Sequence, residues 1–177
     1  MQTPEIEIVK LNTKDWPIYK QIRLEALKNE PQAFSTTYAD MLARPDDFWI
    51  GRVMAAESED KDWLLLLAKI DGQAIGMIGA YCENGWGKHD TAYIVGVYVN
   101  RAYRGLGVGK KLLEAMLAKL KRIPNLATVR LSVNSIQAPA VGLYESCGFR
   151  ATGQEESQAG DSKTYTEVHY QRPVRDP

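Results

Sequence analysis

The spacing of apolar residues changes several times along the chain, and each change predicts a new element. Apolar and polar residues alternate over 5–11, which predicts a first strand with one solvated face. From there to Pro31 the apolar residues recur at helical spacing, and this predicts a helix. Two shorter helices are predicted over 38–42 and 46–56.

The middle of the chain is dominated by short apolar runs typical of strands. Strands are predicted over 63–70, 73–82 and 91–99. Asp71-Gly72 joins the first two as a hairpin signal, and a turn-rich loop covers 83–90.

Helical and strand patterns then alternate up to the end of the chain. A helix begins at the glycines near residue 108 and ends before Pro124, and a strand follows over 128–133. A second helix over 138–146 is closed by Gly148, and two more strands flank a polar loop at 154–162. The order of elements predicts a mixed sheet flanked by helices.

Composition fits one globular domain, and we expect it to span 1–177. Hydrophobic residues make up 45% and charged residues 25%, with 22 residues of each sign. This balance predicts no nucleic-acid or membrane partner. The N-terminus shows no secretion signal, and Cys82 and Cys147 lack metal-ligand spacing. We therefore expect two buried free thiols, no metal and a cytoplasmic protein.

The most informative stretch is VNRAYRGLGVGK, in which three alternate glycines separate an apolar strand from a helix. Such a turn brings the backbone close to a ligand, and the positive end of the following helix favours phosphate. The spacing excludes a P-loop, because Arg104 stands at its first glycine and Lys111 follows Lys110. A dinucleotide fingerprint fails as well, because Lys110 replaces its third glycine. A tight turn without a ligand stays open as an alternative.

Two segments resemble a known family. VYVNRAYRGLGVGKKLLEAML is similar to the acetyl-CoA-binding segment of the GNAT superfamily of N-acetyltransferases, whose signature is supplied here by Arg104, Gly107 and Gly109. LSVNSIQAPAVGLYESCGF resembles the next signature of that superfamily, through Val133, Ala140, Leu143, Tyr144, Gly148 and Phe149. Two motifs in the right order are more specific than either one alone.

The resemblance implies a fold and a cofactor. The fold is mixed α/β (α+β), with a mostly antiparallel sheet of about seven strands, helices on both faces, and splayed fourth and fifth strands. The cofactor is acetyl-CoA, whose pantetheine arm fills the gap between those strands. The implied binding residues are Val97, Tyr98 and Val99 beside the thioester, Arg104, Gly105, Leu106, Gly107, Val108, Gly109 and Lys110 around the pyrophosphate, and Gln137 or Asn134 on the arm.

The implied chemistry is direct attack of a primary amine on the thioester. Tyr144 matches the position of the acid that protonates the leaving thiolate, although it could instead be a packed helix tyrosine. In many members a glutamate on the fourth strand acts as the general base, whereas 91–99 contains no carboxylate. Surface roles are expected for Glu25, Glu83, His89 and Asp90, and a structural one for His169. The general base is left unassigned.

The leading hypothesis is an N-acetyltransferase acting on an amine of a small molecule, peptide or protein. The alternative is a non-catalytic acyl-CoA-binding module of the same fold, which the missing carboxylate favours and Tyr144 disfavours. A nucleotide-phosphate binder is a third, weaker reading. Family members often dimerise, so the resemblance leaves a homodimer as one possible oligomeric state. The identity of the amine cannot be derived from the sequence.

Overall fold

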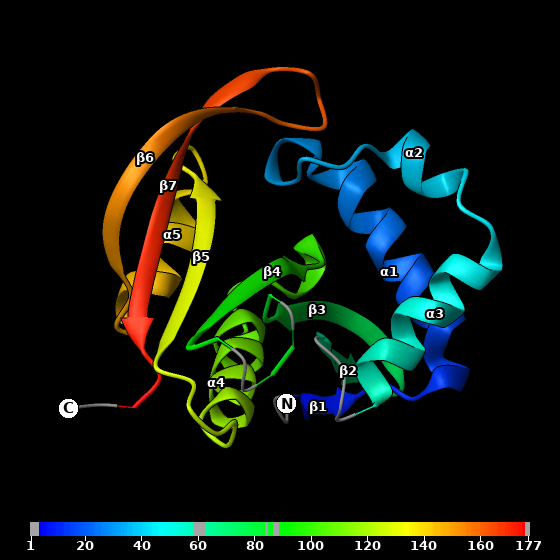
Figure 1. Cartoon of the computed structure of the whole chain (residues 1–177). Coiled ribbons are helices and arrows are strands. Elements are labelled where there is room, and N and C mark those ends of the chain that lie inside the picture. Colours follow the sequence, from blue (N-terminus) through cyan, green and yellow to red (C-terminus); the bar gives the residue numbers. More distant parts are fainter. Residues whose placement is uncertain (1–3, 59–62, 84, 87–88, 176–177) are drawn as a thin grey trace.

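One seven-stranded sheet organises the computed structural model, which describes residues 4–58, 63–83, 85–86 and 89–175 (Figure 1). The strand order is β1-β2-β3-β4-β5-β7-β6, and every neighbouring pair is antiparallel except β4 and β5. The strands are β1 (Glu7–Lys10), β2 (Trp63–Ile70), β3 (Gln73–Tyr81), β4 (Thr91–Val99), β5 (Thr128–Asn134), β6 (Arg150–Gln158) and β7 (Thr164–Pro173).

Helices cover both faces of this sheet. One face packs against α1 (Trp16–Asn29), α2 (Tyr38–Leu42) and α3 (Asp46–Glu57), and the other against α4 (Val108–Leu120) and α5 (Ala138–Ser146). Three short 3-10 helices lie in the connections between these strands and helices: η1 (Thr13–Asp15), η2 (Pro31–Ala33) and η3 (Arg101–Tyr103). In the described ranges no helix is long and apolar enough to cross a membrane.

The apolar run of β2 shows how the two cores form. Leu65 and Leu67 lie in the core under α1 and α3, whereas Leu66 and Ala68 lie in the core that contains α4. Successive side chains of a strand point to opposite faces, so a strand buried on both sides needs no polar alternation. The apolar run from Leu65 to Ala68 is therefore buried on both faces of the sheet.

The parallel pair β4 and β5 is short and opens into a gap. Only Thr91, Ala92 and Tyr93 pair with β5, and beyond them the two strands separate (Figure 1). A bulge distorts β4 in the same region, because Gly96 and Val97 lie opposite the single residue Ile78 of β3. The predicted splay of the fourth and fifth strands is confirmed.

Most predicted elements are confirmed to within one or two residues, including the two-residue turn at Asp71-Gly72 between Ile70 and Gln73. The loop predicted over 154–162 is wrong at its start, since β6 continues to Gln158. This strand lies at the edge of the sheet with both faces exposed, so its sequence lacks apolar alternation.

Two further predictions concern the cysteines and the loop over 83–90. Cys82 and Cys147 are not joined by a disulfide; Cys82 is buried, as predicted, whereas Cys147 is partly exposed. Within the loop predicted over 83–90, residues 84, 87 and 88 lie outside the described residues.

Candidate active site

The glycine turn leads directly into the N-terminus of α4. Gly105 and Gly107 have φ values of 81° and 80°, and a Cβ built at either position would meet no atom within 4 Å. Gly107 is the N-cap of α4 and has no side chain to accept the first-turn N–H groups. The turn therefore presents backbone donors and the positive helix end to an open surface, which suits an anion.

A groove of about 600 Å³ runs along this turn, and we call it the turn groove. It brings together eleven of the thirteen residues that the family resemblance implied. They are Val97, Tyr98, Val99, Arg104, Gly105, Gly107, Val108, Gly109, Lys110, Gln137 and Tyr144. The exceptions are Leu106, which is 43% exposed outside the groove, and Asn134.

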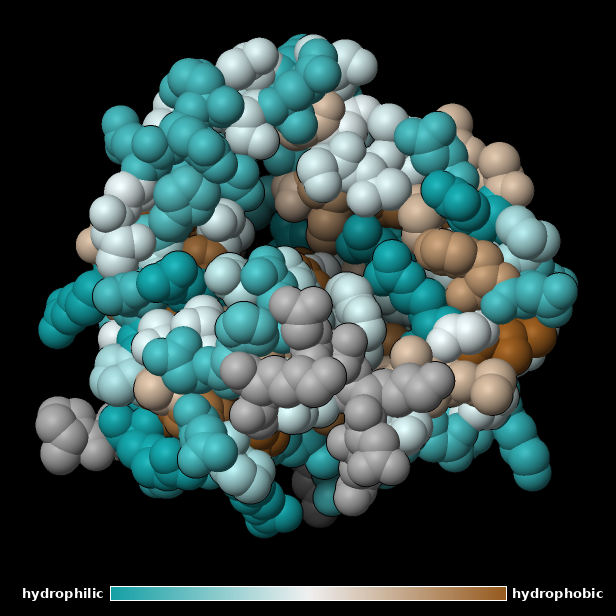
Figure 2. All heavy atoms as spheres, viewed as in Figure 1, coloured by the Kyte–Doolittle hydropathy of each residue, from teal (hydrophilic) through white to brown (hydrophobic). Residues whose placement is uncertain are grey.

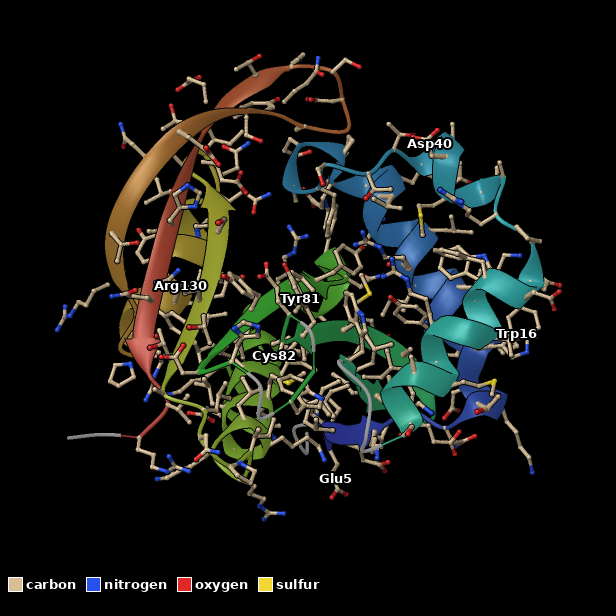
Figure 3. All side chains as sticks on the ribbon, viewed as in Figure 1. Glu5, Trp16, Asp40, Tyr81, Cys82 and Arg130 are labelled. Carbon is tan, nitrogen blue, oxygen red and sulfur yellow. The ribbon has the colours of Figure 1, made fainter. Side chains whose placement is uncertain are left out.

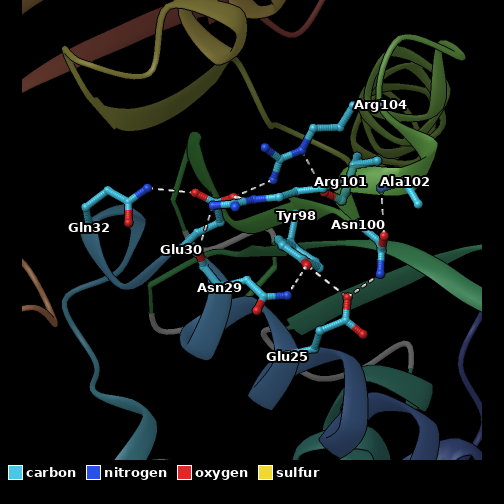
Figure 4. A network of polar contacts seen from close by, with 10 residues as sticks. Glu25, Asn29, Glu30, Gln32, Tyr98, Asn100, Arg101, Ala102 and Arg104 are labelled. Atoms are coloured by element: carbon cyan, nitrogen blue, oxygen red, sulfur yellow. Dashed lines mark hydrogen bonds and ion pairs between the residues drawn. The ribbon is translucent and has the colours of Figure 1, made fainter.

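The side chain of Tyr98 is directed at α1 rather than into the groove. Its hydroxyl donates to Glu25 Oε1 at 2.9 Å and accepts from Asn29 Nδ2 at 3.3 Å (Figure 4). Asn100 Nδ2 donates to the same glutamate oxygen at 2.7 Å. Tyr98 can therefore offer the groove its backbone, while its side chain fastens β4 to α1.

Arg104 is also engaged within the protein. Its Nη2 lies 2.8 Å from Glu30 Oε1, and its Nε donates to the Val99 carbonyl at 3.0 Å (Figure 4). Arg101 Nε reaches the same glutamate oxygen at 2.9 Å, and Gln32 Nε2 donates to Glu30 Oε2 at 2.7 Å. The two arginines thus tie the turn to the end of α1.

Glu30 is the centre of this network and is only 9% exposed. Burial acts to raise the pKa of its carboxyl, but hydrogen bonds from Arg101, Arg104 and Gln32 outweigh burial and hold the pKa below its ordinary value. Glu30 is therefore ionised at neutral pH, and its ion pairs hold Arg101 and Arg104 against the end of α1.

The two candidates for the pantetheine arm differ in their availability. Asn134 donates to the Gln32 carbonyl at 3.2 Å and accepts from the Ile136 N–H at 3.1 Å. The Gln137 side chain makes no hydrogen bond within the described part of the chain and lines the turn groove. Gln137 is thus the better placed of the two.

A second hollow of about 830 Å³ lies where the sheet splays, and we call it the splay cavity. Figure 2 shows a hollow between the two halves of the molecule on this face. One wall carries Arg23, Arg52 and the aromatic residues of β2, β3 and β4, with Tyr81 near the middle of Figure 3. The other wall consists of β5, β6 and β7 and carries Arg130 (Figure 3). Glu167 of β7 also lines the splay cavity.

Segment 31–36 forms a roof between these walls. The tip of the β6–β7 hairpin packs against it, and the Gly160 N–H donates to the Phe34 carbonyl at 2.6 Å. The Asn134 amide fastens the same segment to the end of β5. The splay cavity is therefore enclosed by elements from both halves of the sheet.

Tyr144 lies where the turn groove and the splay cavity meet, since it lines both. It is 5% exposed, and its hydroxyl has no hydrogen-bond partner among the described residues. Burial raises the pKa of this phenol well above its ordinary value of 10. Tyr144 is therefore a neutral O–H donor at the junction.

Four of the five acids and bases considered from the sequence do not reach this junction. Glu25, Glu83, His89 and Asp90 line neither hollow. Among the described residues, the carboxyl and imidazole side chains that line the splay cavity are those of Glu167 and His169.

His169 takes part in a polar chain on the cavity wall. Its Nδ1 lies 2.7 Å from Ser132 Oγ, and its Nε2 lies 3.4 Å from Glu155 Oε1. The positions of His169 and Glu167 in the cavity have no local sequence signal, because they depend on how β7 pairs with β5. No group of three His, Cys, Asp or Glu residues suited to a metal ion exists in the described ranges.

A splayed sheet with a glycine turn at a helix N-terminus on one side and a cavity on the other is an arrangement that suits an acyl-CoA ligand. Residues 13–149 match the model of the acetyltransferase (GNAT) family, which is more than half of the chain. This chain therefore belongs to the GNAT family, and the resemblance carried by the two motifs is confirmed.

Curated relatives of this chain are named as N-acetyltransferases. An N-alpha-acetyltransferase of Sulfurisphaera tokodaii is 31% identical over 93 residues, which is 48% of this chain and 54% of the relative. The chain spans about half the length of the first curated relatives it matches.

Two solved structures show the same fold. A GNAT-family acetyltransferase from Streptococcus pneumoniae superimposes with a TM-score of 0.81 at 19% identity, over 97% of this chain and all of that one. The yncA protein of Salmonella typhimurium, solved with its cofactor acetyl-CoA, gives a TM-score of 0.80 at 18% identity, over 98% and 96% of the two chains.

Proposed function

We propose that this chain is an acetyl-CoA-dependent N-acetyltransferase that transfers the acetyl group to a primary amine of a small molecule, peptide or protein. The observation that carries the proposal is the meeting of the two hollows at Tyr144. One hollow fits the acetyl donor, and the other leaves room for an acceptor on the opposite side of the same opening.

The turn groove suits coenzyme A in shape and charge. The first-turn N–H groups of α4 and the exposed Lys110 would hold the pyrophosphate. The apolar end of β4 and the free amide of Gln137 would line the pantetheine arm. Bound acetyl-CoA supplies the acetyl thioester.

The residues at the junction account for the bonds that change. The acceptor nitrogen forms a bond to the thioester carbonyl carbon, and the bond from that carbon to sulfur breaks. Backbone N–H donors within 97–99, beside the bulge of β4, would stabilise the negative charge on the carbonyl oxygen. Tyr144 gives its proton to the leaving thiolate, and Glu167 or His169 takes the proton that the amine loses.

We further propose one domain over 1–177 in a reducing cytoplasmic setting. The sheet continues from β1 to β6, and both apolar cores pack against it. Two cysteines that are not joined by a disulfide fit a reducing compartment.

The donor assignment is tested by melting temperature. We expect acetyl-CoA to raise it, because a ligand that binds only the folded chain stabilises it, whereas ATP and NAD should not. Equal shifts with all three ligands, or no shift with acetyl-CoA, would contradict the donor assignment.

The catalytic assignment is tested by Tyr144→Phe, with thiol release from acetyl-CoA measured on a panel of amines. Loss of the hydroxyl should lower kcat about 100-fold and leave acetyl-CoA affinity nearly unchanged. Tyr38→Phe is the matched control, since Tyr38 lines neither hollow. Unchanged kcat would remove the role of Tyr144, and acetyl-CoA binding without thiol release on any amine would favour the non-catalytic module.

A further inference from the structure

The splay cavity contains positive charge that the protein itself does not neutralise. Arg23 and Arg52 lie on its α1 and α3 wall, and neither forms an ion pair within the described part of the chain. The Nη1 atom of Arg23 is buried without a hydrogen-bond partner. A buried guanidinium nitrogen without a partner is costly, so such an atom marks a place that a ligand completes.

The position of Arg23 within the cavity is well defined. Its guanidinium stacks over the Phe34 ring, with Cζ 4.5 Å from the ring centroid. A Cβ built on Gly96 would lie 3.8 Å from Arg23 Nη1. Because Gly96 belongs to the bulge of β4, the free donor of Arg23 lies beside the backbone that we place next to the thioester.

The electrostatics agree with this geometry. Burial lowers the pKa of the Arg23 guanidinium, the field of Tyr19 raises it, and the charge of Arg52 lowers it further. An arginine nevertheless keeps its proton in proteins, so the cavity holds an uncompensated cation. The carboxylate on the opposite wall is Glu167, and it belongs to β7.

We propose that the acceptor is an α-amino acid whose carboxylate binds Arg23 while its amine faces the thioester, which rests on the proposed acetyltransferase function. The amine and the carboxylate must be close together in the acceptor, because Arg23 and the thioester site lie against adjacent residues of β4. In an α-amino acid, amine and carboxylate are attached to the same carbon. Arg23 is thus a specificity-determining residue for the acceptor.

The rest of the acceptor would lie along an aromatic row. Trp63 stacks on Tyr81 with centroids 5.2 Å apart, and Tyr81 stacks on Tyr93 at the same distance. All three line the cavity, and Arg52 covers Trp63 with Cζ 5.0 Å from its ring. A flat apolar side chain packs well on such a surface, so phenylalanine is a suitable test acceptor.

The test compares phenylalanine, phenylalanine amide and phenethylamine at saturating acetyl-CoA. We expect kcat/KM to be about 10- to 100-fold higher for the acid than for the amide, because a charged hydrogen-bond partner is lost. Arg23→Gln should remove this difference, and Arg23→Lys should restore part of it. Arg44→Gln is the matched control, since Arg44 is an exposed arginine that lies outside both hollows.

A binding measurement keeps the proposal falsifiable if a variant turns over slowly. N-acetylphenylalanine should bind the CoA-loaded protein about 10- to 100-fold more tightly than its amide in calorimetry. Neither product carries a titrating amine, so amine basicity plays no part.

Three outcomes would overturn the proposal: an amide used or bound as well as the acid, an equal effect of Arg23→Gln on both, or no binding of the acid. The proposed function would still stand if phenethylamine supported thiol release, and it would fail separately if no amine did.

Discussion

The three alternate glycines of the turn are needed for different physical reasons; they are Gly105, Gly107 and Gly109. The first two have positive φ with open space where a Cβ would be, so the backbone conformation requires them. Gly109 lies inside α4, and a Cβ there would be 3.2 Å from Leu143 Cδ2 of α5. The third glycine therefore allows the two helices to approach each other beside the groove.

A glycine with positive φ and a glycine inside a helix should respond to alanine in opposite ways, one losing and the other gaining unfolding free energy. Gly107→Ala forces an L side chain into the left-handed region and should lower the free energy of unfolding by about 1–2 kcal/mol. Gly51 lies inside α3 with open space around it, so Gly51→Ala should raise that free energy by about 1 kcal/mol. Urea unfolding measures both, and a stabilising Gly107→Ala would contradict the turn geometry.

At the scale of elements, the roof of the splay cavity depends on one close approach. A Cβ on Gly160 would lie 2.9 Å from the Thr36 carbonyl oxygen, 3.1 Å from that of Phe34 and 3.2 Å from that of Pro31. Three backbone carbonyls leave no flexible group that could give way. The β6–β7 hairpin can therefore close over segment 31–36 only with glycine at this position.

Gly160→Ala should displace the roof and spare the turn groove. We expect a loss of about 1–3 kcal/mol in unfolding free energy and a higher KM for the acceptor, with unchanged acetyl-CoA affinity. Gly153→Ala is the control, since Gly153 lies in the same hairpin with open space around it. If both variants gave the same acceptor KM, the roof would have no part in acceptor binding.

Sequence reasoning succeeded for the elements whose signals are local. The apolar run of β2, the Asp71-Gly72 turn and the glycines before α4 are each read within a few residues. The start of the loop at 154–162 was misplaced, because an edge strand exposed on both faces carries no apolar pattern. The position of Arg23 in the cavity has no local signal in the sequence, because it arises only when α1 packs over the bulge of β4.

For the whole molecule, Glu30 joins segments that are far apart in the chain. Arg101 and Arg104 follow it by 71 and 74 residues, and both bond to the same carboxylate oxygen (Figure 4). The network holds the end of α1 against the turn between β4 and α4. Part of the stability of the fold is therefore linked to the ionisation of one carboxyl group.

This linkage predicts how stability changes with acid. The folded-state pKa of Glu30 lies below its ordinary value of 4.5, so the unfolded chain binds the proton more readily. The stabilisation is fully present above about pH 4.5 and is lost as pH falls through the lower folded-state pKa.

We expect Glu30→Gln to lower the unfolding free energy by roughly 1.5–3 kcal/mol at neutral pH and to flatten its fall in acid. Glu114→Gln, at an exposed position, should stay within about 0.5 kcal/mol of the wild type. Urea unfolding between about pH 3 and 7 makes the comparison, and parallel pH curves for wild type and Glu30→Gln would contradict the linkage.

The two hollows differ in what recognises their ligands, and this affects how the protein can evolve. In the function proposed above, the turn groove would bind the donor through main-chain geometry, because Gly105 and Gly107 set the direction of peptide groups. The splay cavity would bind the proposed acceptor through side chains such as Arg23 and Trp63, which line it. Single substitutions in the cavity can therefore redirect the protein to a new acceptor while its grip on the donor is inherited unchanged.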